Sequence, residues 1–474
     1  MSKEWPLYLA GRWEKSPDTL PVTNPYDGSL VGTTYLATAD QLEEATAAAA
    51  KAFRTTSHLA SYEREDILLS ISRGITERRD ELALLMAREA GKPVRDAAVE
   101  VTRAANTFKV AAEEAKRIGG EVIPIDWLPL AKGRLGITRR FPIGPVAAIS
   151  PFNFPLNLAA HKIAPAIAVG NPVVVKPPSD APLALLTMAG IVHESGLPPG
   201  GFSVLPMTRA LGDRVVSDDR FKLLTFTGSS PVGWGMKERA GKKRLVLEMG
   251  GNGGVIVDRD ADLEYAVQRV VAGAFSFAGQ VCISVQRVFI HEDVYDAFTG
   301  SLVDAVKRLK VGDPVDPETD VGPVIDDASA ERIEAWIQEA VQAGGRVLTG
   351  GSRQGRLFEP TVLADVSTAC KICSSEAFAP IVDVYSFRDF DEALARVNES
   401  AYGLQAGVFT GSLEHALRAF EELEVGGVMI NDVSTFRIDH MPFGGTKGSG
   451  FGREGVKYAI EDQTEVRLMV LNRV

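Results

Sequence analysis

The chain has 474 residues, 45% of them hydrophobic and 24% charged, with 45 glycines, a composition that excludes a disordered or fibrous protein. Its length exceeds the usual domain size of about 100 to 200 residues, so we expect two or three packed units. The formal net charge is -11 and no dense run of Lys and Arg occurs, which argues against nucleic acid as a partner.

The N-terminal segment 1–6 lacks the basic and apolar parts of a signal peptide. No apolar run reaches the roughly 18 residues that a membrane span needs. We therefore expect a cytoplasmic protein that does not enter a membrane. Further along the chain, the alanine run 47–50 is expected inside a helix, and another helix carries an apolar stripe from Val101 to Ala115.

From about residue 139, short apolar runs alternate with longer amphipathic runs, which is typical of a parallel sheet covered by helices. Residues 144–149 and 172–175 are expected strands, and a helix over 156–169 between them completes a β-α-β unit. The series continues with a helix over 181–194 and strands over 202–206, 222–226 and 245–248.

A second alternating series predicts another α/β domain. Helices over 263–277 and 294–309 flank a strand at 287–290, and the series runs to a strand at 428–430. Residues 120–140 and 464–470 fit neither series and have the pattern of strands without a neighbour in the sequence. They are expected to pair with each other or across a subunit boundary, which favours a homodimer or homotetramer.

Three cysteines are too few for a disulfide framework. Cys370 and Cys373 form one CxxC pair without the second pair that a zinc site needs, so we interpret them as ordinary thiols and predict no metal. Cys282 follows a helix and a Gly279-Gln280 pair that can turn the chain and expose backbone N–H groups. Taken alone, such a cysteine is more often a small buried hydrophobic residue than a nucleophile.

Glu248 stands at a predicted strand end and is followed by Gly250 and Gly251, where the backbone can approach a ligand closely. A carboxylate in this position suits a general base, although a capping or solvated glutamate gives the same pattern. Two further segments add to the Cys282 and Glu248 segments. They are Pro-Phe-Asn-Phe-Pro at 151–155 and Glu-Ala-Phe-Ala-Pro at 376–380.

With these motifs in this order, the chain closely resembles the aldehyde dehydrogenase superfamily over nearly its whole length, from Asn24-Pro25 to the glycine-rich segment 447–452. The nearest branches are the lactaldehyde, phosphonoacetaldehyde and non-phosphorylating glyceraldehyde-3-phosphate dehydrogenases. The chain departs from the family's usual residues at four positions: Gly253, Gly254, Ser284 and Gln286. These departures make the subfamily harder to assign but do not change the expected chemistry.

The resemblance implies an NAD(P)-dependent oxidoreductase that converts an aldehyde to an acid. It makes Cys282 the nucleophile that forms a thioester, Asn153 the side-chain donor to the oxyanion, and Glu248 the base that activates water. Hydride leaves only if a nicotinamide lies against the carbon, so the reaction requires a dinucleotide. The alternatives are a CoA-acylating dehydrogenase, against which Glu248 argues, and a non-catalytic protein on the same scaffold, against which the three intact residues argue.

The cofactor is expected at 175–179 and 225–233, where glycines and a helix N-terminus suit a pyrophosphate, although the Gly228 to Gly233 spacing alone also fits a plain turn. NAD-selective members usually carry a glutamate at the position of Ser179, and its carboxylate repels a 2′-phosphate. Ser179 cannot repel it, so NADP is expected to be accepted and NAD is not excluded. In the family, Lys176 faces the adenosine ribose and Glu376 holds the nicotinamide ribose beside Phe378. The other expected contacts are Ser150, Pro151, Phe152, Gly212, Phe226, Thr227, Gly228, Ser229, Gly233 and Met249.

Arg103, His161 and Arg437 match positions in the family's substrate tunnel that are apolar in many members. Arg103 also fits a solvated arginine beside the apolar helix stripe. Two guanidiniums directed at one pocket are costly without an anion, so a small aldehyde bearing a phosphate, phosphonate, sulfonate or carboxylate is predicted. His161 is expected to add a donor or, equally, to be a packed structural histidine.

The expected fold class is therefore α/β. A Rossmann-like cofactor domain is expected over 1–119 and 141–247, and a second α/β catalytic domain over 248–440. A small β extension for oligomerisation is expected over 120–140 and 459–474. Residues 248–254 are expected to join the two larger domains.

Overall fold

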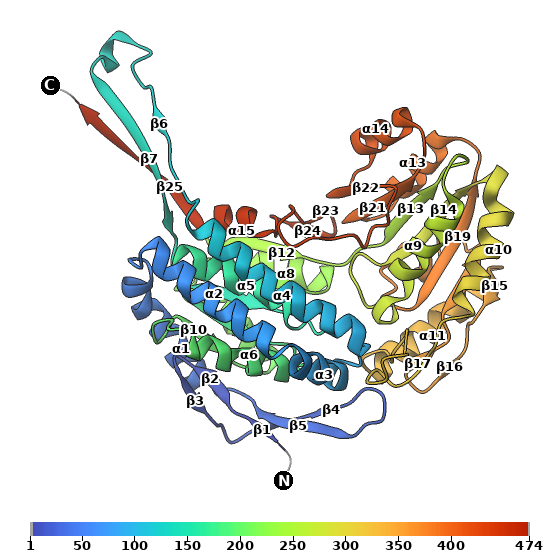
Figure 1. Ribbon diagram of the computed structural model, residues 1–474, viewed down its shortest axis with the longest axis horizontal. Coiled ribbons are helices and arrows are strands. Elements are labelled where there is room, and N and C mark those ends of the chain that lie inside the picture. Colours follow the sequence, from blue (N-terminus) through green and yellow to red (C-terminus); the bar gives the residue numbers. More distant parts are fainter. Residues whose placement is uncertain (1–2, 473–474) are drawn as a thin grey trace.

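Two largely parallel sheets organise the chain, with a two-domain body and a projecting β arm (Figure 1). The computed structural model describes residues 3–472. None of the helices in these residues is long and apolar enough to cross a bilayer. The predicted α/β class with a Rossmann-like half is confirmed.

The first sheet contains five parallel strands whose side chains are almost all buried, because helices cover both faces. They are β8 (Val146–Ile149), β9 (Val173–Lys176), β10 (Phe202–Val204), β11 (Leu223–Thr227) and β12 (Arg244–Glu248). Their spatial order is β10-β9-β8-β11-β12, so the chain reverses direction across the sheet beside β8. In such sheets, ligands bind outside the carboxyl ends of the strands at this reversal.

Both edges of the first sheet take antiparallel strands that the alternating pattern did not predict. The hairpin of β2 (Leu7–Leu9) and β3 (Arg12–Glu14) extends one edge, and β24 (Gly450–Phe451) pairs with β12 at the other. These strands are too short to show a period of two. A separate small sheet is formed by β1 (Glu4–Trp5), β4 (Thr19–Thr23) and β5 (Leu30–Tyr35).

Helices pack in two layers on one face of this sheet and in one layer on the other. The fully buried α5 (Asn157–Val169) and the largely buried α6 (Leu183–Glu194) lie against the sheet, and α2 (Ser61–Glu77), α3 (Arg79–Ala90) and α4 (Val94–Ala115) cover them. The opposite face carries α1 (Ala39–Thr56), α7 (Arg209–Ser217) and α8 (Ser230–Arg239). The alanine run lies inside α1, as predicted.

A buried carboxylate fixes the start of α5. Glu100 on α4 accepts hydrogen bonds from the backbone N–H groups of Leu156 and Asn157, both at 3.0 Å. It also pairs with the buried Lys92. A carboxylate at a helix N-terminus satisfies unpaired N–H groups and complements the helix dipole. The loop that precedes α5 and carries Asn153 is therefore held in one position.

The second domain is a seven-stranded sheet in the order β15-β18-β19-β14-β13-β21-β22, parallel except for its edge strand β15. Its strands are β13 (Gly253–Val257), β14 (Val285–His291), β15 (Arg346–Thr349), β18 (Thr361–Ala364), β19 (Ile381–Phe387), β21 (Gln405–Phe409) and β22 (Gly427–Ile430). Its helices are α9 (Leu263–Phe275), α10 (Tyr295–Val306), α11 (Asp327–Gln342), α12 (Lys371–Ser374), α13 (Phe390–Asn398) and α14 (Leu413–Glu422). Two small antiparallel pairs complete it: the hairpin of β16 (Arg353–Gln354) with β17 (Leu357–Phe358), and the pair of β20 (Tyr402–Gly403) with the distant β23 (Thr446–Lys447).

The arm is formed by the two segments that fitted neither series. β7 (Arg134–Pro142) pairs antiparallel with β25 (Thr464–Asn472) over nine residue pairs, and β6 (Val122–Ile123) pairs with β7. Of the two predicted alternatives, pairing with each other is thus observed within the chain. The arm projects away from the body (Figure 1). The predicted domain limits left 441–458 unassigned, and there β24 and the start of α15 (Val456–Asp462) pack on the first domain.

Candidate active site

Three segments from both domains meet where the chain crosses between the sheets. Glu248 is the last residue of β12, and the following four residues lead directly to Gly253 at the start of β13. Cys282 lies in the loop between α9 and β14, and Asn153 lies in the loop between β8 and α5. All three loops leave the carboxyl ends of parallel strands or lie opposite them, which is where this architecture places its sites.

Close backbone contacts hold these segments together. Asn153 Nδ2 donates to the carbonyl oxygen of Gln280 at 2.9 Å, two residues before Cys282. A side chain on Gly251 would collide with the carbonyl of Cys282, and one on Gly279 would collide with the carbonyl of Ala379. Gly279 also has a φ of +66°, which L side chains rarely adopt. The glycines around Cys282 are therefore needed for close approach.

Glu248 is buried, and neither carboxylate oxygen has a hydrogen-bond partner in the described part of the chain. Burial raises its pKa well above the ordinary value, and the negative charge of Glu454 raises it further. Burial likewise raises the pKa of the Cys282 thiol to about 12, and Glu376 adds to that shift. The enclosed site therefore disfavours negative charge on both groups, which leaves Glu248 as a proton acceptor far stronger than a solvated carboxylate.

A buried ionic cluster lies beneath Glu248. Glu454 accepts from Lys162 Nζ at 3.0 Å and from Arg437 Nη2 at 2.9 Å. Burial alone would raise the pKa of Glu454, but the two cations lower it to about 2. Lys162 Nζ also donates to the Thr227 hydroxyl at 2.7 Å. A buried charge needs such partners, and the cluster ties α5, β11 and the segment before α15 together.

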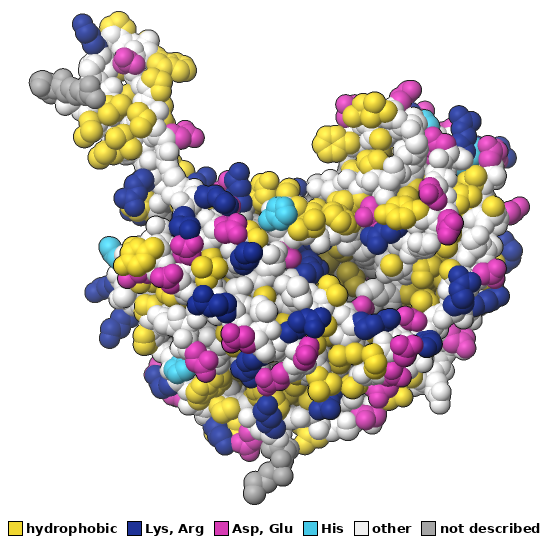
Figure 2. All heavy atoms as spheres, viewed as in Figure 1, with side chains coloured by type: hydrophobic (Ala, Val, Ile, Leu, Met, Phe, Trp, Pro, Cys, Tyr) yellow, Lys and Arg dark blue, Asp and Glu magenta, His cyan; other side chains and the backbone are white. Residues whose placement is uncertain are grey.

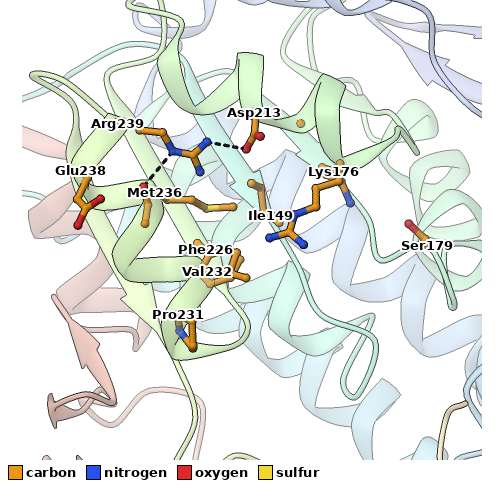
Figure 3. A pocket seen from close by; sticks show the side chains of 13 residues that line it. Ile149, Lys176, Ser179, Asp213, Phe226, Pro231, Val232, Met236, Glu238 and Arg239 are labelled. Carbon is orange, nitrogen blue, oxygen red and sulfur yellow. Dashed lines mark hydrogen bonds and ion pairs between the residues drawn. The ribbon is translucent and has the colours of Figure 1, made fainter. Parts of the chain in front are cut away.

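A cavity of about 570 Å³ opens beside the carboxyl ends of β8, β9 and β11 (Figure 3). Lys176 and Ser179 lie at one end of it, while Arg239 and Asp213 at the other end form an ion pair at 3.2 Å. The predicted contacts Gly212 and Phe226 also line this cavity, as does Arg209. Glycine at 212 leaves room for the Lys176 side chain, which packs against it. The size, the cations and the adjacent N-terminus of α8 fit the adenosine end of a dinucleotide.

Glycines allow close packing at the N-terminus of α8. A side chain on Gly228 would collide with the Phe226 ring, and one on Gly233 would collide with Met249. The helix begins after the N-cap Ser229 and carries Pro231 in its first turn. The segment therefore leads into a helix N-terminus, and Pro231 and Val232 of its first turn line the cavity.

A second cluster lies nearer Cys282. Glu376 is half-buried beside Gly250 and accepts from the Gly251 N–H at 3.3 Å, and desolvation raises its pKa to about 7. The rings of Phe152 and Phe378 meet edge to face with centroids 5.9 Å apart. Phe378 has a φ of +49°, a strained value for a bulky residue. Glu376 therefore lies against the glycine backbone that joins the two domains.

Comparison with known proteins agrees with this geometry. A model of the aldehyde dehydrogenase family matches residues 13–469. The chain belongs to the aldehyde dehydrogenase family. It is 43% identical over 471 residues to the 3-sulfolactaldehyde dehydrogenase of Priestia megaterium, covering 99% of this chain and 98% of the relative. It is 41% identical over 472 residues to the lactaldehyde dehydrogenase of Methanocaldococcus jannaschii, covering 98% and 100%.

Solved aldehyde dehydrogenases superpose closely. Aldehyde dehydrogenase 21 of Physcomitrella patens, in complex with the reaction product succinate, has a TM-score of 0.98 and 46% identity over 100% of this chain and 99% of that one. The glyceraldehyde-3-phosphate dehydrogenase GapN of Methanocaldococcus jannaschii, complexed with NADP, has a TM-score of 0.92 and 41% identity over 96% and 99%. The chain is therefore an aldehyde dehydrogenase that uses NAD(P).

Two of the departures from the family pattern have a structural role in this aldehyde dehydrogenase. The Gln286 amide donates to the carbonyls of Ile372 and Ser375 at 2.6 and 2.8 Å and accepts from the Ala377 N–H at 2.9 Å. It therefore fixes both sides of Glu376. Gly253 packs against the carbonyl of Ser284, where a side chain would collide.

A second cavity, of about 360 Å³, leads from the surface between α4 and α9 toward Val281, next to Cys282. Figure 2 shows a hollow between the two domains with Lys and Arg side chains near its rim. Arg103 lines this cavity, and Arg269, which the sequence did not single out, lines it from α9. Phe154, the neighbour of Asn153, forms part of its wall. This cavity has the position of a substrate passage.

The argument that Arg103 and Arg437 require an external anion is wrong. Arg103 Nη2 donates to Asp439 at 2.9 Å, and Arg437 Nη2 donates to Glu454 at 2.9 Å. The chain itself supplies a carboxylate to each guanidinium, at positions the sequence analysis did not identify. Arg437 also lies over the Phe443 ring at 3.6 Å and is nearly buried, with 5% of its side chain exposed.

His161 Nε2 lies 3.0 Å from Asp439 Oδ1, which agrees with the packed structural histidine that was one of its two expected roles. The Thr227 hydroxyl accepts from Lys162 Nζ at 2.7 Å. Ser150 Oγ is buried without a partner in residues 3–472. Lys162, Arg209, Asp439 and Glu454 were missed because a lone charged residue carries no periodic signal.

Proposed function

We propose that this enzyme oxidises a small anionic aldehyde to its acid through a thioester on Cys282. The observation that supports it is the meeting of Cys282, Glu248 and Asn153 at the junction of the two domains. Cys282 Sγ attacks the aldehyde carbon and loses its proton to a base. The Asn153 amide and the Cys282 backbone N–H donate to the oxyanion that forms.

Collapse of the oxyanion expels hydride and leaves the thioester, and NAD(P), when bound, accepts that hydride. Glu248 then removes a proton from water, which attacks the thioester carbon, and the Cys282 thiol leaves as the acid forms. The unpartnered oxygens of Glu248 and its raised pKa suit this role, because a carboxylate whose pKa lies above the ordinary value takes a proton more readily. They favour water over CoA as the acyl acceptor.

The support for an anionic substrate lies in Arg103. Its Nε and Nη2 bind Asp439, while its Nη1 forms no hydrogen bond within residues 3–472, and a quarter of the side chain remains exposed in the passage. Its guanidinium can therefore hold Asp439 and still donate to a phosphate, sulfonate or carboxylate. Arg437 is buried against Glu454, so its part in anion binding is proposed as electrostatic.

Changing Arg103 to Met should raise KM for an anionic aldehyde about 10-fold, because one charge-assisted hydrogen bond is worth about 1 to 3 kcal/mol. Neutral aldehydes should be nearly unaffected. The measurement is kcat/KM for glyceraldehyde 3-phosphate and for propionaldehyde, with NADPH formation followed and the acid product quantified without CoA.

Lys109→Met is the matched control, since it removes one charge from the exposed face of the same helix. Equal losses on both aldehydes in Arg103→Met would contradict the anion contact. Failure to form the free acid without CoA, with an acyl-CoA appearing once CoA is added, would instead refute hydrolysis by Glu248.

Coenzyme choice is proposed to depend on the cations around Ser179. Lys176 and Arg209 line the same cavity, and nothing acidic stands at position 179. Arg209 begins α7, directly after the loop that follows β10, and its guanidinium is exposed toward solvent. We infer that NADP is accepted and that Arg209 contributes to holding its 2′-phosphate.

Ser179→Glu should lower kcat/KM for NADP about 10- to 100-fold relative to NAD, because like charges about 4 Å apart repel by roughly 1 to 4 kcal/mol in this environment. Steady-state rates with each coenzyme give the ratio. Ser179→Ala removes the hydroxyl without adding charge and should leave the ratio within a few-fold of wild type. An unmoved ratio in Ser179→Glu means that residue 179 does not face the ribose.

We also propose that the arm forms a homodimer or homotetramer. The outer strand β25 exposes Val466, Leu468 and Val470, and the tip of the arm exposes Trp127. A long apolar strand edge of this kind is rarely left in water.

The cytoplasmic location predicted from the sequence remains a proposal.

A further inference from the structure

The backbone just before Cys282 has a strained conformation. Phe277, Ala278 and Gly279 have φ values of +48°, +53° and +66°, all in the left-handed region. Residues with a Cβ rarely adopt this region, because the Cβ crowds the following carbonyl oxygen. Phe277 and Ala278 therefore hold a conformation that depends on the surrounding structure.

One carboxylate from the first domain holds this segment. Asp96, in the first turn of α4, accepts hydrogen bonds from the Ser276 hydroxyl at 2.8 Å and from the Phe277 N–H at 3.2 Å. Ser276 directly follows α9, so both bonds cross the junction between the two domains. Asp96 and Ser276 also line the substrate passage. The mechanism proposed above gives Asp96 no role.

The strained turn sets the path of the chain toward the nucleophile. The Phe277 carbonyl accepts from the Gln280 backbone N–H at 3.1 Å and from the Gln280 side-chain amide at 3.3 Å. The Gln280 carbonyl in turn accepts from Asn153 Nδ2 at 2.9 Å. These bonds fix the direction of the backbone over 280–282, and with it the Cys282 N–H that is to donate to the oxyanion.

The same end of α4 also holds the loop between β8 and α5. Lys92, just before α4 begins, places its ammonium 3.5 Å from the centroid of the Phe154 ring and 4.7 Å from that of Phe277. Glu100 accepts from the N–H groups at the start of α5. Residues 92–100 thus contact both loops that supply oxyanion donors, one from each domain.

We propose that Asp96 is a positioning residue for Cys282. By accepting from the turn before the nucleophile, its carboxylate holds the strained backbone and aligns the Cys282 N–H with the Asn153 amide, so that both donors meet one oxyanion. This role deepens the proposed function and rests on it. Asp96 lies outside the cavity that fits the adenosine end of the cofactor, so its loss should slow the chemical step without weakening NADP binding.

The first test is Asp96→Ala with NADP and propionaldehyde, a neutral substrate whose binding does not depend on the charge lost from the passage. With enzyme in excess, the single-turnover rate constant of NADPH formation should fall about 10- to 100-fold, because a small misplacement of a catalytic group is that costly. The Kd of NADPH, from fluorescence titration, should stay at the wild-type value. Asp80→Ala is the matched control, since it removes an exposed carboxylate from the first turn of α3, and it should change neither quantity.

A glycine at position 278 separates loss of alignment from general damage. Glycine adopts a positive φ without the cost that alanine carries, so Ala278→Gly should raise the single-turnover rate of Asp96→Ala about 3- to 10-fold. Ala274→Gly is the control for this second substitution. Ala274 lies inside α9, where there is no left-handed backbone to relieve, so it should give no recovery.

Two milder variants keep the test valid if Asp96→Ala fails to fold. Ser276→Ala removes one of the two hydrogen bonds and should lower the single-turnover rate about 3-fold, in line with the modest net contribution of one such bond. Asp96→Asn keeps an oxygen that accepts from the Phe277 N–H and should retain most of the wild-type rate.

Wild-type single-turnover rates in both Asp96→Ala and Ser276→Ala would overturn this role, as would a loss in Asp96→Ala that Ala278→Gly leaves unchanged. The proposed function is tested separately by Cys282→Ala. Turnover in that variant would refute the thioester mechanism, whereas a normal rate in Asp96→Ala beside an inactive Cys282→Ala would remove only the role of Asp96.

Discussion

Replacement of Cys282 by alanine should reduce aldehyde oxidation by at least about 10⁴-fold, because the covalent step that makes hydride transfer possible is lost. NADP binding should remain, since Cys282 lies outside the cavity that fits the adenosine end of the cofactor. Steady-state NADPH formation and fluorescence titration with NADPH measure the two properties separately.

The chain offers matched controls in Cys370 and Cys373, which are buried thiols packed in the core of the second domain. Cys370→Ala and Cys373→Ala should keep turnover near that of the wild-type enzyme. After a rapid acid quench that traps the acyl-enzyme, mass spectrometry should find the acyl group on Cys282. Substantial turnover in Cys282→Ala would contradict the thioester mechanism.

Replacement of Glu248 by glutamine should slow steady turnover by about 10² to 10⁴-fold, the usual contribution of a general base. The shape of the side chain is kept, but an amide cannot take a proton from water. Because hydride transfer precedes thioester hydrolysis, a single rapid burst of NADPH should survive. Stopped-flow absorbance at enzyme concentrations comparable to substrate would resolve the burst from the slow phase.

Glu421→Gln, on the exposed surface of α14, is the control for loss of one carboxylate and should change neither phase. Loss of the burst along with the steady rate in Glu248→Gln would assign Glu248 to activation of the thiol as well. That outcome is physically reasonable because burial raises the pKa of Cys282 to about 12, so the thiol needs a base. A normal steady rate would exclude Glu248 as the base for water.

Much of the first sheet follows from sequence alone because its signals are local. A fully buried strand appears in the sequence as a short apolar run. The observed strands at 146–149 and 173–176 lie close to the predicted ranges 144–149 and 172–175. Strand pairing was predictable only as alternatives, since antiparallel pairing of β7 with β25 joins residues more than 300 positions apart. The edge strands β2, β3 and β24 are too short to carry a period and depend on the sheet they extend.

The sequence also pointed to the residues at the junction. Cys282, Glu248 and Asn153 each lie in a short local motif, and these motifs occur in the order typical of the family. Their assembly depends on tertiary contacts, such as the bond from Asn153 to the Gln280 carbonyl. The catalytic roles of these residues stay proposals until the variants are measured.

The charge balance of the substrate passage was decided by the tertiary structure. From the sequence, Arg103 and Arg437 are two unexplained cations, and a missing anion is the simplest inference. The fold brings Asp439 to Arg103 across 336 positions and Glu454 to Arg437. Electrostatic pairing depends on distance in space and not on spacing along the chain, so no periodic or local signal reports it. The same holds for His161, which meets the same Asp439 across 278 positions.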